Sequence, residues 1–502
     1  MDFWKFEPTE MVHLADQTIA GLAVFFFYAA ILLNYFTFAW LFDRRLSVIM
    51  VVVQLVCQQF WDFAETGLPQ LLLLFLFSGA MLCVTRLLMA QADGRRQWPW
   101  IGATGVFFGL MALAHPLTLT ILVGAVIFVG VVCATKQPRV ETEMEPLMHP
   151  AVRFFAAVGV RGLLILAIVA AIFVPWLVRN AQVCGDFRGL SWQSKSHMLR
   201  GSESVIMRTL KEPDETVQPS SFVPKMFTQT MEQMDRLYYF LGKVPMALVF
   251  FVALLHNFKR RETRVLRWGL FLMWILAVGG MSLFGFADYD LLTKEQSNDL
   301  HVLFIPFFAA YGLAFVLNLW SRLEIDGHAL SSVRVINGAF TTLLIGISAM
   351  PLLTRYLTPP ALPVNFPPYF PSIIAKIGDW YTERDVICSD MPWGVAWYTD
   401  RRSLWLPLAK RDFITLNTFT FDNRINGLFL TPVSGYRGLQ TDIDAGEFRE
   451  WSLFIRHDKY VLDPALRASD HLPFNVVNDD IFFLGARNYV LYADRNRWSD
   501  RQ

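Results

Sequence analysis

Acidic and basic residues stand at the ends of several apolar stretches, where their side chains can reach a charged group at a membrane surface. Asp62 and Glu65 carry carboxylates, and a carboxylate acts as a base only within about 3 Å of the hydroxyl that gives up its proton. Arg179, followed by Asn180, suits a bidentate grip on a phosphate. These residue types could supply a base and an anion-binding group. The alternative is that the two acids are solvated loop charges and that Arg179 extends to lipid headgroups without a catalytic role.

Three further residues belong to the same candidate set. Lys294 and His301 flank the start of a late apolar stretch and carry hydrogen-bond donors that a phosphate can accept. His115 precedes Pro116 between two apolar stretches, where a histidine more often has a structural role. None of the five cysteines forms a pair with metal or redox spacing. No metal site and no cofactor are therefore predicted, although a divalent ion is compatible with this chemistry.

The elements that position these residues are apolar stretches long enough to cross a bilayer. A membrane-spanning helix needs about 20 apolar residues, because each residue advances about 1.5 Å across about 30 Å of hydrocarbon. The sequence predicts about ten such spans. They lie near residues 18–42, 46–60, 68–90, 98–114, 116–135, 158–178, 244–258, 266–286, 302–320 and 335–355.

Basic residues fall in every second connection between these spans, which predicts the orientation of the chain. Lys and Arg stay preferentially on the cytoplasmic side of a membrane. The basic connections are at 43–45, 86–96, 136–161, 259–267 and 322–334. The intervening connections, including residues 60–70, the long loop 179–243 and residues 287–301, are then outside. The predicted orientation therefore places Glu65, Arg179, Lys294 and His301 on the same, outer side of the membrane.

The composition excludes several classes of protein. Hydrophobic residues make up 54% of the chain and charged residues only 17%, and a water-soluble protein could not bury that much apolar surface. The net charge of +1 argues against a nucleic acid as partner. The sequence therefore predicts a multi-pass protein of the cytoplasmic membrane, with a transmembrane domain at 17–356.

The chain changes character at residue 357. A proline-rich connector, 357–372, favours an extended path and leads to a polar segment, 373–502. Helices are predicted at 373–382, 393–399 and 411–418, and strands at 385–389, 403–406, 426–431, 460–462, 481–484 and 489–492. This order predicts a small extracytoplasmic α/β domain on a mainly parallel sheet. In it, Trp393 and Trp397 either stack on a sugar of the acceptor or form an apolar docking face against the membrane part.

The long loop 179–243 has two parts with helical patterns, near 194–211 and 223–241. In the second part, apolar residues recur every three or four positions and form one stripe. They are Phe227, Met231, Met234, Leu237 and Leu241. The pattern predicts a helix that lies along the outer interface of the membrane, and packing against the tail explains it equally well.

Four short motifs occur in a fixed order and on defined sides of the predicted membrane. They are Asp43-Arg44-Arg45, Gly109-Leu110-Met111-Ala112-Leu113 leading to His115, Pro175-Trp176-Leu177-Val178-Arg179-Asn180 followed by Gly185-Asp186, and His301-Val302-Leu303-Phe304-Ile305-Pro306. Their order and sidedness resemble the pattern of the GT-C membrane glycosyltransferases, including the protein O-mannosyltransferase and lipid A aminoarabinose transferase branches. The resemblance covers most of residues 17–355, and residues 389–401 resemble the tails of some bacterial members.

The resemblance implies an enzyme that transfers a sugar from a polyprenyl-phosphate donor to a lipid, glycan or protein acceptor at the outer face of the cytoplasmic membrane. The reaction is an inverting direct displacement in which the lipid phosphate leaves and an acidic residue activates the acceptor hydroxyl. By this resemblance, Glu65 is the preferred acid and Asp62 the next. The residues expected to bind the donor phosphate are Arg179, Asn180, Lys294 and His301.

The chain departs from the family pattern at its N-terminus. The family begins with a span that leads to an outside loop bearing its catalytic acid, whereas residues 1–16 here are already predicted to lie outside. No signal peptide is visible. We therefore expect either a first span that inserts with its N-terminus outside or a span and acid loop upstream of Met1, and the pattern favours the second.

Two other functions stay open at this level. A catalytically incomplete remnant, or a partner subunit of such an enzyme, would share the fold without the acid. A transporter or flippase also has many spans with scattered polar residues, but it predicts internal repeats that this sequence does not show.

Overall fold

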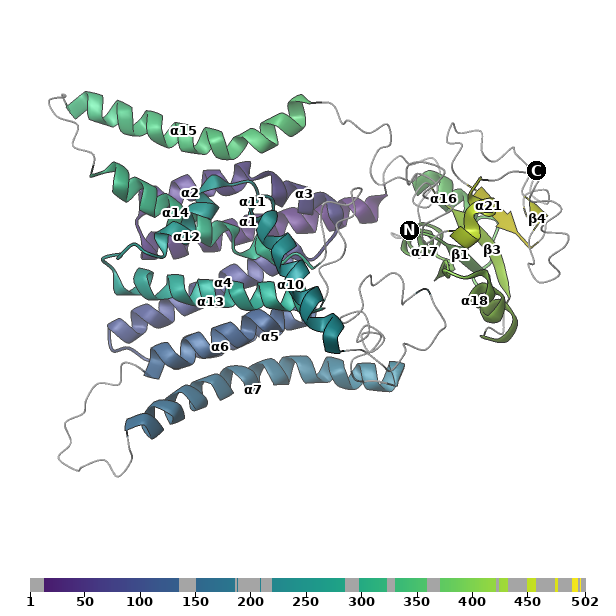
Figure 1. Cartoon of the computed structure of the whole chain (residues 1–502), viewed down its shortest axis with the longest axis horizontal. Helices are drawn as coiled ribbons and strands as arrows, with labels where there is room; N and C mark the ends of the chain where they lie inside the picture. Colours follow the sequence, from purple (N-terminus) through teal and green to yellow (C-terminus); the bar gives the residue numbers. More distant parts are fainter. Residues whose placement is uncertain are drawn as a thin grey trace. The chain divides into compact units, whose positions relative to one another are not determined.

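A computed structural model of the chain describes residues 13–134, 150–185, 187, 208, 219–284, 298–322, 330–358, 371–420, 424–431, 449–456, 475–476, 490–494 and 497. The chain separates into two compact units, whose elements are drawn in Figure 1. The membrane unit comprises Ile19–Gly201 and Val217–Pro359. The tail unit comprises Met1–Thr18, Ser202–Thr216 and Pro360–Gln502, so it draws on three separate segments of the sequence.

Helices stand at the positions of all the predicted spans. Among the described residues, five are long and apolar enough to cross a membrane, or six if the bent pair α2 and α3 forms one span. By these helices the chain is a multi-pass membrane protein. In chain order the helices are α1 (Leu14–Leu41), α2 (Arg44–Val56), α3 (Gln58–Thr66), α4 (Gln70–Ala92), α5 (Trp98–Ala114), α6 (Thr118–Ala134), α7 (Pro150–Cys184), α10 (Pro219–Asp235), α11 (Leu237–Phe240), α12 (Pro245–Ala253), α13 (Arg261–Phe284), η2 (His301–Leu303), α14 (Ile305–Trp320) and α15 (Leu330–Leu357).

The predicted count of about ten spans depends on the short helices. Helices α5, α6 and α14 are apolar but shorter than the five long ones. Helix α12 has nine residues, and at about 1.5 Å per residue it covers only about half of the hydrocarbon thickness. Arg267 of α13 contacts the end of this helix, because its guanidinium donates to the carbonyl oxygen of the last residue, Ala253, at 3.1 Å and to that of His256 just beyond it. The count of ten spans therefore remains a prediction.

Helices α12 and α14 cross at a glycine. The rings of Phe250 and Phe308 stack at 3.9 Å between the two helices, and a Cβ added at Gly312 would overlap the carbonyl oxygen of Met246. We expect Gly312→Ala to lower the free energy of unfolding by about 1–3 kcal/mol, because the helices must separate to admit the methyl group. The midpoint of thermal unfolding in one detergent measures this. Gly346→Ala in α15 is the matched control, since nothing lies within 4 Å of its added Cβ, and equal midpoints for the two variants would contradict the prediction.

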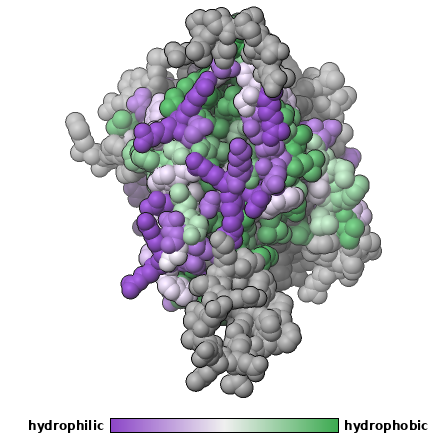
Figure 2. All heavy atoms as spheres, turned by 90° about the vertical axis from the view of Figure 1, so that its left-hand side faces the viewer, coloured by the Kyte–Doolittle hydropathy of each residue, from purple (hydrophilic) through white to green (hydrophobic). Residues whose placement is uncertain are grey.

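The basic connections of the sequence gather at one end of the membrane unit. Figure 2 faces the end that lies on the left of Figure 1, and hydrophilic side chains cover its middle. The exposed basic residues of the connections α1–α2, α4–α5 and α12–α13, and of the end of α14, are Arg44, Arg45, Arg95, Arg96, Lys259, Arg260 and Arg322. The basic connections, which alternate with acidic ones along the sequence, thus lie together at one end of the helices, and the side of the membrane that this end faces stays a prediction.

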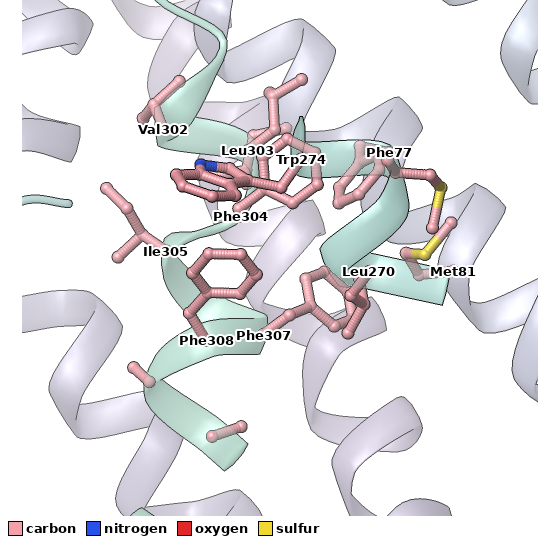
Figure 3. Close-up of a cluster of buried hydrophobic side chains, with 14 of the residues drawn as sticks. Phe77, Met81, Leu270, Trp274, Val302, Leu303, Phe304, Ile305, Phe307 and Phe308 are labelled. Atoms are coloured by element: carbon pink, nitrogen blue, oxygen red, sulfur yellow. The ribbon is translucent and has the colours of Figure 1, made fainter. Parts of the chain in front are cut away.

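Aromatic side chains fill the core of the membrane unit around the start of α14. Figure 3 shows Phe304, Phe307 and Phe308 packed against Phe77 of α4 and Trp274 of α13. The ring centroids of Phe77 and Phe304 are 5.0 Å apart, and those of Trp274 and Phe308 are 6.0 Å apart. Residues 301–308 are therefore held rigidly from two sides, and the same packing fixes His301.

The tail unit contains a five-stranded sheet with strand order β2-β1-β3-β5-β4. Strand β1 is parallel to both β2 and β3, and β5 is antiparallel to β3 and β4. All four residues of β1 are buried, as expected of a central parallel strand covered on both faces. The strands are β1 (Val386–Ser389), β2 (Arg402–Trp405), β3 (Ile425–Leu430), β4 (Asn475–Val476) and β5 (Val490–Ala493), and the helices are α16 (Pro371–Gly378), α17 (Pro392–Thr399), α18 (Lys410–Thr415), η3 (Leu416–Thr420), η4 (Arg449–Trp451) and α21 (Ser452–Arg456).

Four of the predicted strands coincide with β1, β2, β3 and β5. The strands predicted at 460–462 and 481–484 lie outside the described residues. Strand β4 was not predicted, because a strand of two residues has no detectable alternation.

An ion pair between Asp385 and Arg497 joins the first part of segment 373–502 to its C-terminal end. Asp385 Oδ2 accepts from the Thr382 amide at 2.7 Å and from Arg497 Nη1 at 2.8 Å, and the Arg497 side chain is almost completely buried. Burial alone would raise the pKa of the Asp385 carboxyl, but the hydrogen bonds from Thr382 and Arg497 outweigh it and lower that pKa.

The lowered pKa of Asp385 predicts a loss of stability in acid. An unfolded aspartate titrates near pH 4 (about 3.9), so this carboxylate stabilises the fold above that pH, and the contribution disappears as the pH falls through the lower pKa of the folded state. We expect Asp385→Asn to flatten the dependence of the unfolding midpoint on pH between about pH 5 and pH 2. Asp379→Asn, at an exposed position of the same unit, should leave it unchanged. If the unfolding midpoint of Asp385→Asn depended on pH as steeply as that of the wild type, the Asp385 carboxylate would not be the cause of the acid sensitivity.

Candidate active site

A break between α2 and α3 positions the two candidate acids. The helix axis turns by 51° at this break, where Cys57 has extended backbone angles. Trp61 Nε1 donates to the carbonyl oxygen of Leu55 at 2.8 Å, so one carbonyl released by the break keeps a partner. Helix α3 ends at Gly67, whose φ of +70° is the left-handed conformation that a glycine adopts without strain. Between break and glycine, Asp62 and Glu65 fall on one side of α3, three residues apart.

Arg355, in the last turn of α15, bridges both carboxylates. Its Nη1 pairs with Asp62 Oδ1, and its Nη2 lies 2.7 Å from Glu65 Oε2. The Glu65 side chain is 64% exposed, whereas that of Asp62 is only 14% exposed. Of the two, Glu65 is the carboxylate that an incoming hydroxyl can reach.

Arg355 was not singled out from the sequence. The available signal was its position, because a basic residue at the outer end of a span opposes the preference of arginine for the cytoplasmic side. The same argument identified Arg179. What the sequence did not indicate is the pairing, since 290 residues separate Arg355 from Glu65.

His301 is the centre of a buried polar cluster, which we call the His301 node. The indole N–H of Trp274 donates to His301 Nδ1 at 3.1 Å, so the ring proton resides on Nε2 and is directed at Gln233 Oε1, 3.2 Å away. The Gln233 amide in turn donates to Ser282 Oγ at 2.8 Å, and that oxygen lies 2.8 Å from Thr230 Oγ1. Both nitrogens of this fully buried histidine therefore have protein partners.

The His301 node extends to α3 and to His115. The His301 amide donates to Asp299 Oδ1 at 2.8 Å, and Gln59 of α3 donates to Asp299 Oδ2 at 3.1 Å. The neighbouring Asn298 hydrogen-bonds His115, in the turn between α5 and α6. Burial lowers the pKa of His115 and this hydrogen bond opposes the shift, and the net effect is a lowered pKa. Segment 298–301 thus contacts His115 through Asn298 and connects His301 to α3, the helix that carries the two acids, through Asp299.

Helix α10 packs against the His301 node with its polar side. Gln233 is completely buried against the node, whereas Phe227 and Met231 are exposed, at 61% and 49%. The structure therefore contains the predicted helix, and part of its predicted apolar stripe faces outward. An outward apolar side suits a helix at the lipid interface. The first predicted helical part of this loop, 194–211, lies outside the described residues except for Arg208.

Arg179 and Asn180 lie in α7, near its C-terminal end. Arg179 is exposed and Asn180 is buried. In Figure 1 this end of α7 is at the same end of the membrane unit as α3, α10 and the C-terminal end of α15. Among the described residues, no hydrogen bond or ion pair joins Arg179 to Glu65 or to His301. Lys294 lies outside the described residues, and Trp393 and Trp397 belong to the tail unit.

Within the part of the chain that the structure describes, no three His, Cys, Asp or Glu side chains are grouped so that they could hold a metal ion. The groups available for chemistry are the exposed carboxylate of Glu65 and the guanidinium of Arg355 beside it. The buried His301 is connected to the same helix through Asp299 and Gln59.

No protein-family model and no curated protein matches the chain. The chain is similar to the solved structure of ArnT from Cupriavidus metallidurans in the apo state, with a TM-score of 0.45 and 14% identity over 96% of this chain and 84% of that chain. For the same protein bound to undecaprenyl phosphate, the TM-score is 0.47 and the identity 12%, over the same shares.

Proposed function

We propose that the chain is a membrane glycosyltransferase of the GT-C type, which moves a sugar from polyprenyl phosphate to an acceptor hydroxyl. The observation that carries the proposal is the exposed carboxylate of Glu65, held beside Arg355 at the end of the membrane unit opposite the basic connections. A donor with a lipid tail and a charged head would bind at this end of the membrane unit, because its head stays at the membrane interface while its tail stays in the hydrocarbon.

In the proposed reaction the acceptor oxygen attacks the anomeric carbon of the donor sugar from the side opposite the phosphate. The bond between that carbon and the phosphate oxygen breaks, and its electron pair leaves with the polyprenyl phosphate. Glu65 takes the proton of the acceptor hydroxyl, with Asp62 as the second candidate. The configuration at the anomeric carbon is inverted.

The departing phosphate gains negative charge, and donors near it stabilise the transition state. Arg179, Asn180 and Lys294 are proposed for this role. His301 contributes directly only if its Nε2 exchanges Gln233 for the phosphate, because Trp274 already donates to Nδ1. His115 is better explained as support for segment 298–301.

The test is turnover by the full chain in lipid nanodiscs, given polyprenyl phosphate carrying radiolabelled pentoses or hexoses. Release of polyprenyl phosphate is measured together with transfer of label to lipid, glycan or protein acceptors. We expect release that depends on one class of sugar. A folded chain that binds polyprenyl phosphate but consumes no donor would favour the catalytically incomplete remnant or partner subunit. Movement of intact donor between leaflets, with its sugar still attached, would favour the transporter.

A further inference from the structure

The short helix α17 exposes an apolar face. Positions 393, 396 and 397 lie on one side of the helix, since they are spaced three and four residues apart. They hold Trp393, Ala396 and Trp397, all exposed, with 56% of Trp393 and 40% of Trp397 accessible. The opposite side, with Gly394 and Val395, is buried in the tail unit. A helix that faces water carries polar residues on its exposed side, so this arrangement is the reverse of the usual one.

The same helix is bonded to the beginning of α1. Trp397 Nε1 donates to Asp16 Oδ1 at 2.9 Å, and the Tyr398 hydroxyl donates to Asp16 Oδ2 at 2.8 Å. The ring of His13 lies 5.9 Å from that of Trp397 and 5.8 Å from that of Tyr398. Residues 13 and 16 belong to the tail unit, so these contacts are internal to it. Asp16 lies in the first turn of a helix that is long and apolar enough to cross a membrane.

These two observations place α17 at a membrane surface. A spanning helix enters the bilayer at the interface, so the partners of a carboxylate in its first turn must lie at the same depth. Tryptophan is enriched at this depth, because its ring packs among the lipid chains while its N–H meets polar groups. Here the N–H of Trp397 meets Asp16 and its ring stays exposed.

We propose that the exposed face of α17 lies in the phospholipid interface beside the start of α1, with Trp393 and Trp397 as its anchors. Arg402, exposed just beyond the helix, provides a cation for lipid phosphates. A sugar-binding role for the two tryptophans fits less well, because the face offers a sugar only apolar surface between the two indoles.

Depth measurement on the full chain tests this proposal. Trp393→Cys and Ala396→Cys are each spin-labelled in nanodiscs of phosphatidylcholine and phosphatidylglycerol, and collision with oxygen, which dissolves in lipid, is compared with collision with a water-soluble nickel chelate. We expect the ratio of oxygen to nickel collisions at both positions to be several-fold higher than at Arg411→Cys, an exposed position in α18. The labelled wild-type chain supplies the background from the native cysteines.

Two results would overturn the proposal. If the ratio of oxygen to nickel collisions at positions 393 and 396 equalled that at 411, the exposed face of α17 would lie in water. Exclusion of both reagents would show that protein, either this chain or a second copy, covers the face. Ala396→Cys makes only a small change at an exposed position, so the test stands even if Trp393→Cys fails to fold. Because the measurement requires no turnover, its outcome is independent of the proposed enzymatic function.

Discussion

Replacing Glu65 with glutamine is expected to lower the turnover of polyprenyl-phosphate-linked sugar by about a thousandfold, in line with the contribution of a general base. Glutamine keeps the shape of the side chain and can still accept from Arg355, but it cannot take the acceptor's proton. The initial rate of polyprenyl phosphate release, with donor and acceptor saturating, measures the effect. If Asp62 is the base instead, Asp62→Asn shows the large loss and Glu65→Gln a small one.

Controls separate this catalytic role from a structural one. The Glu65 pair with Arg355 is exposed, and such pairs contribute only about 0–1 kcal/mol to stability, so Glu65→Gln should unfold at nearly the wild-type temperature. Glu262→Gln makes the same chemical change at the start of α13, at the basic end, and should retain the wild-type rate. Near-normal turnover in both Glu65→Gln and Asp62→Asn would remove the α3 acids from the mechanism.

Arg179→Ala is expected to reduce turnover by about a hundredfold, the effect of removing one donor from a developing oxyanion. The loss should fall on the rate at saturating donor as well as on donor affinity, because the phosphate gains charge as it departs. Arg179→Lys should recover only part of the rate, since lysine keeps the charge but not the planar fork of the guanidinium.

The matched control for Arg179 lies in the same helix. Arg161→Ala removes an arginine from α7 about five turns away, toward the end that carries the basic connections. It should leave turnover unchanged if the effect at Arg179 is local. Wild-type rates in Arg179→Ala, at normal expression, would show that Arg179 only extends to lipid headgroups.

The spans could be predicted because apolar length is a property of contiguous residues. The stretch predicted at 68–90 is α4, Gln70–Ala92, and the stretch predicted at 266–286 is α13, Arg261–Phe284. The stretch predicted at 244–258 is a helix only to Ala253. At this end Arg267, in the next helix, donates to the carbonyl oxygen of Ala253, and apolarity alone does not reveal that contact.

The candidate site was predictable in part. Asp62 and Glu65 could be named from their types and their predicted side of the membrane, and so could Arg179. Arg355 could not be paired with the acids, and Gln233 could not be connected to His301, because each pair joins distant parts of the sequence. The burial of Gln233 could not be predicted either. An apolar stripe shows which side of a helix is apolar, but it does not show whether that side faces lipid or protein.

The sequence by itself determined the apolar segments, the alternation of charge between their connections, and the chemical types available at each end. Only the tertiary structure decided that Arg355 holds Asp62 and Glu65, and that Asp16 holds the aromatic residues of α17. The physical reason is one of range. Hydrophobic length and charge bias act on neighbouring residues, whereas a hydrogen bond or an ion pair exists only when helix packing brings two distant side chains to within about 3 Å.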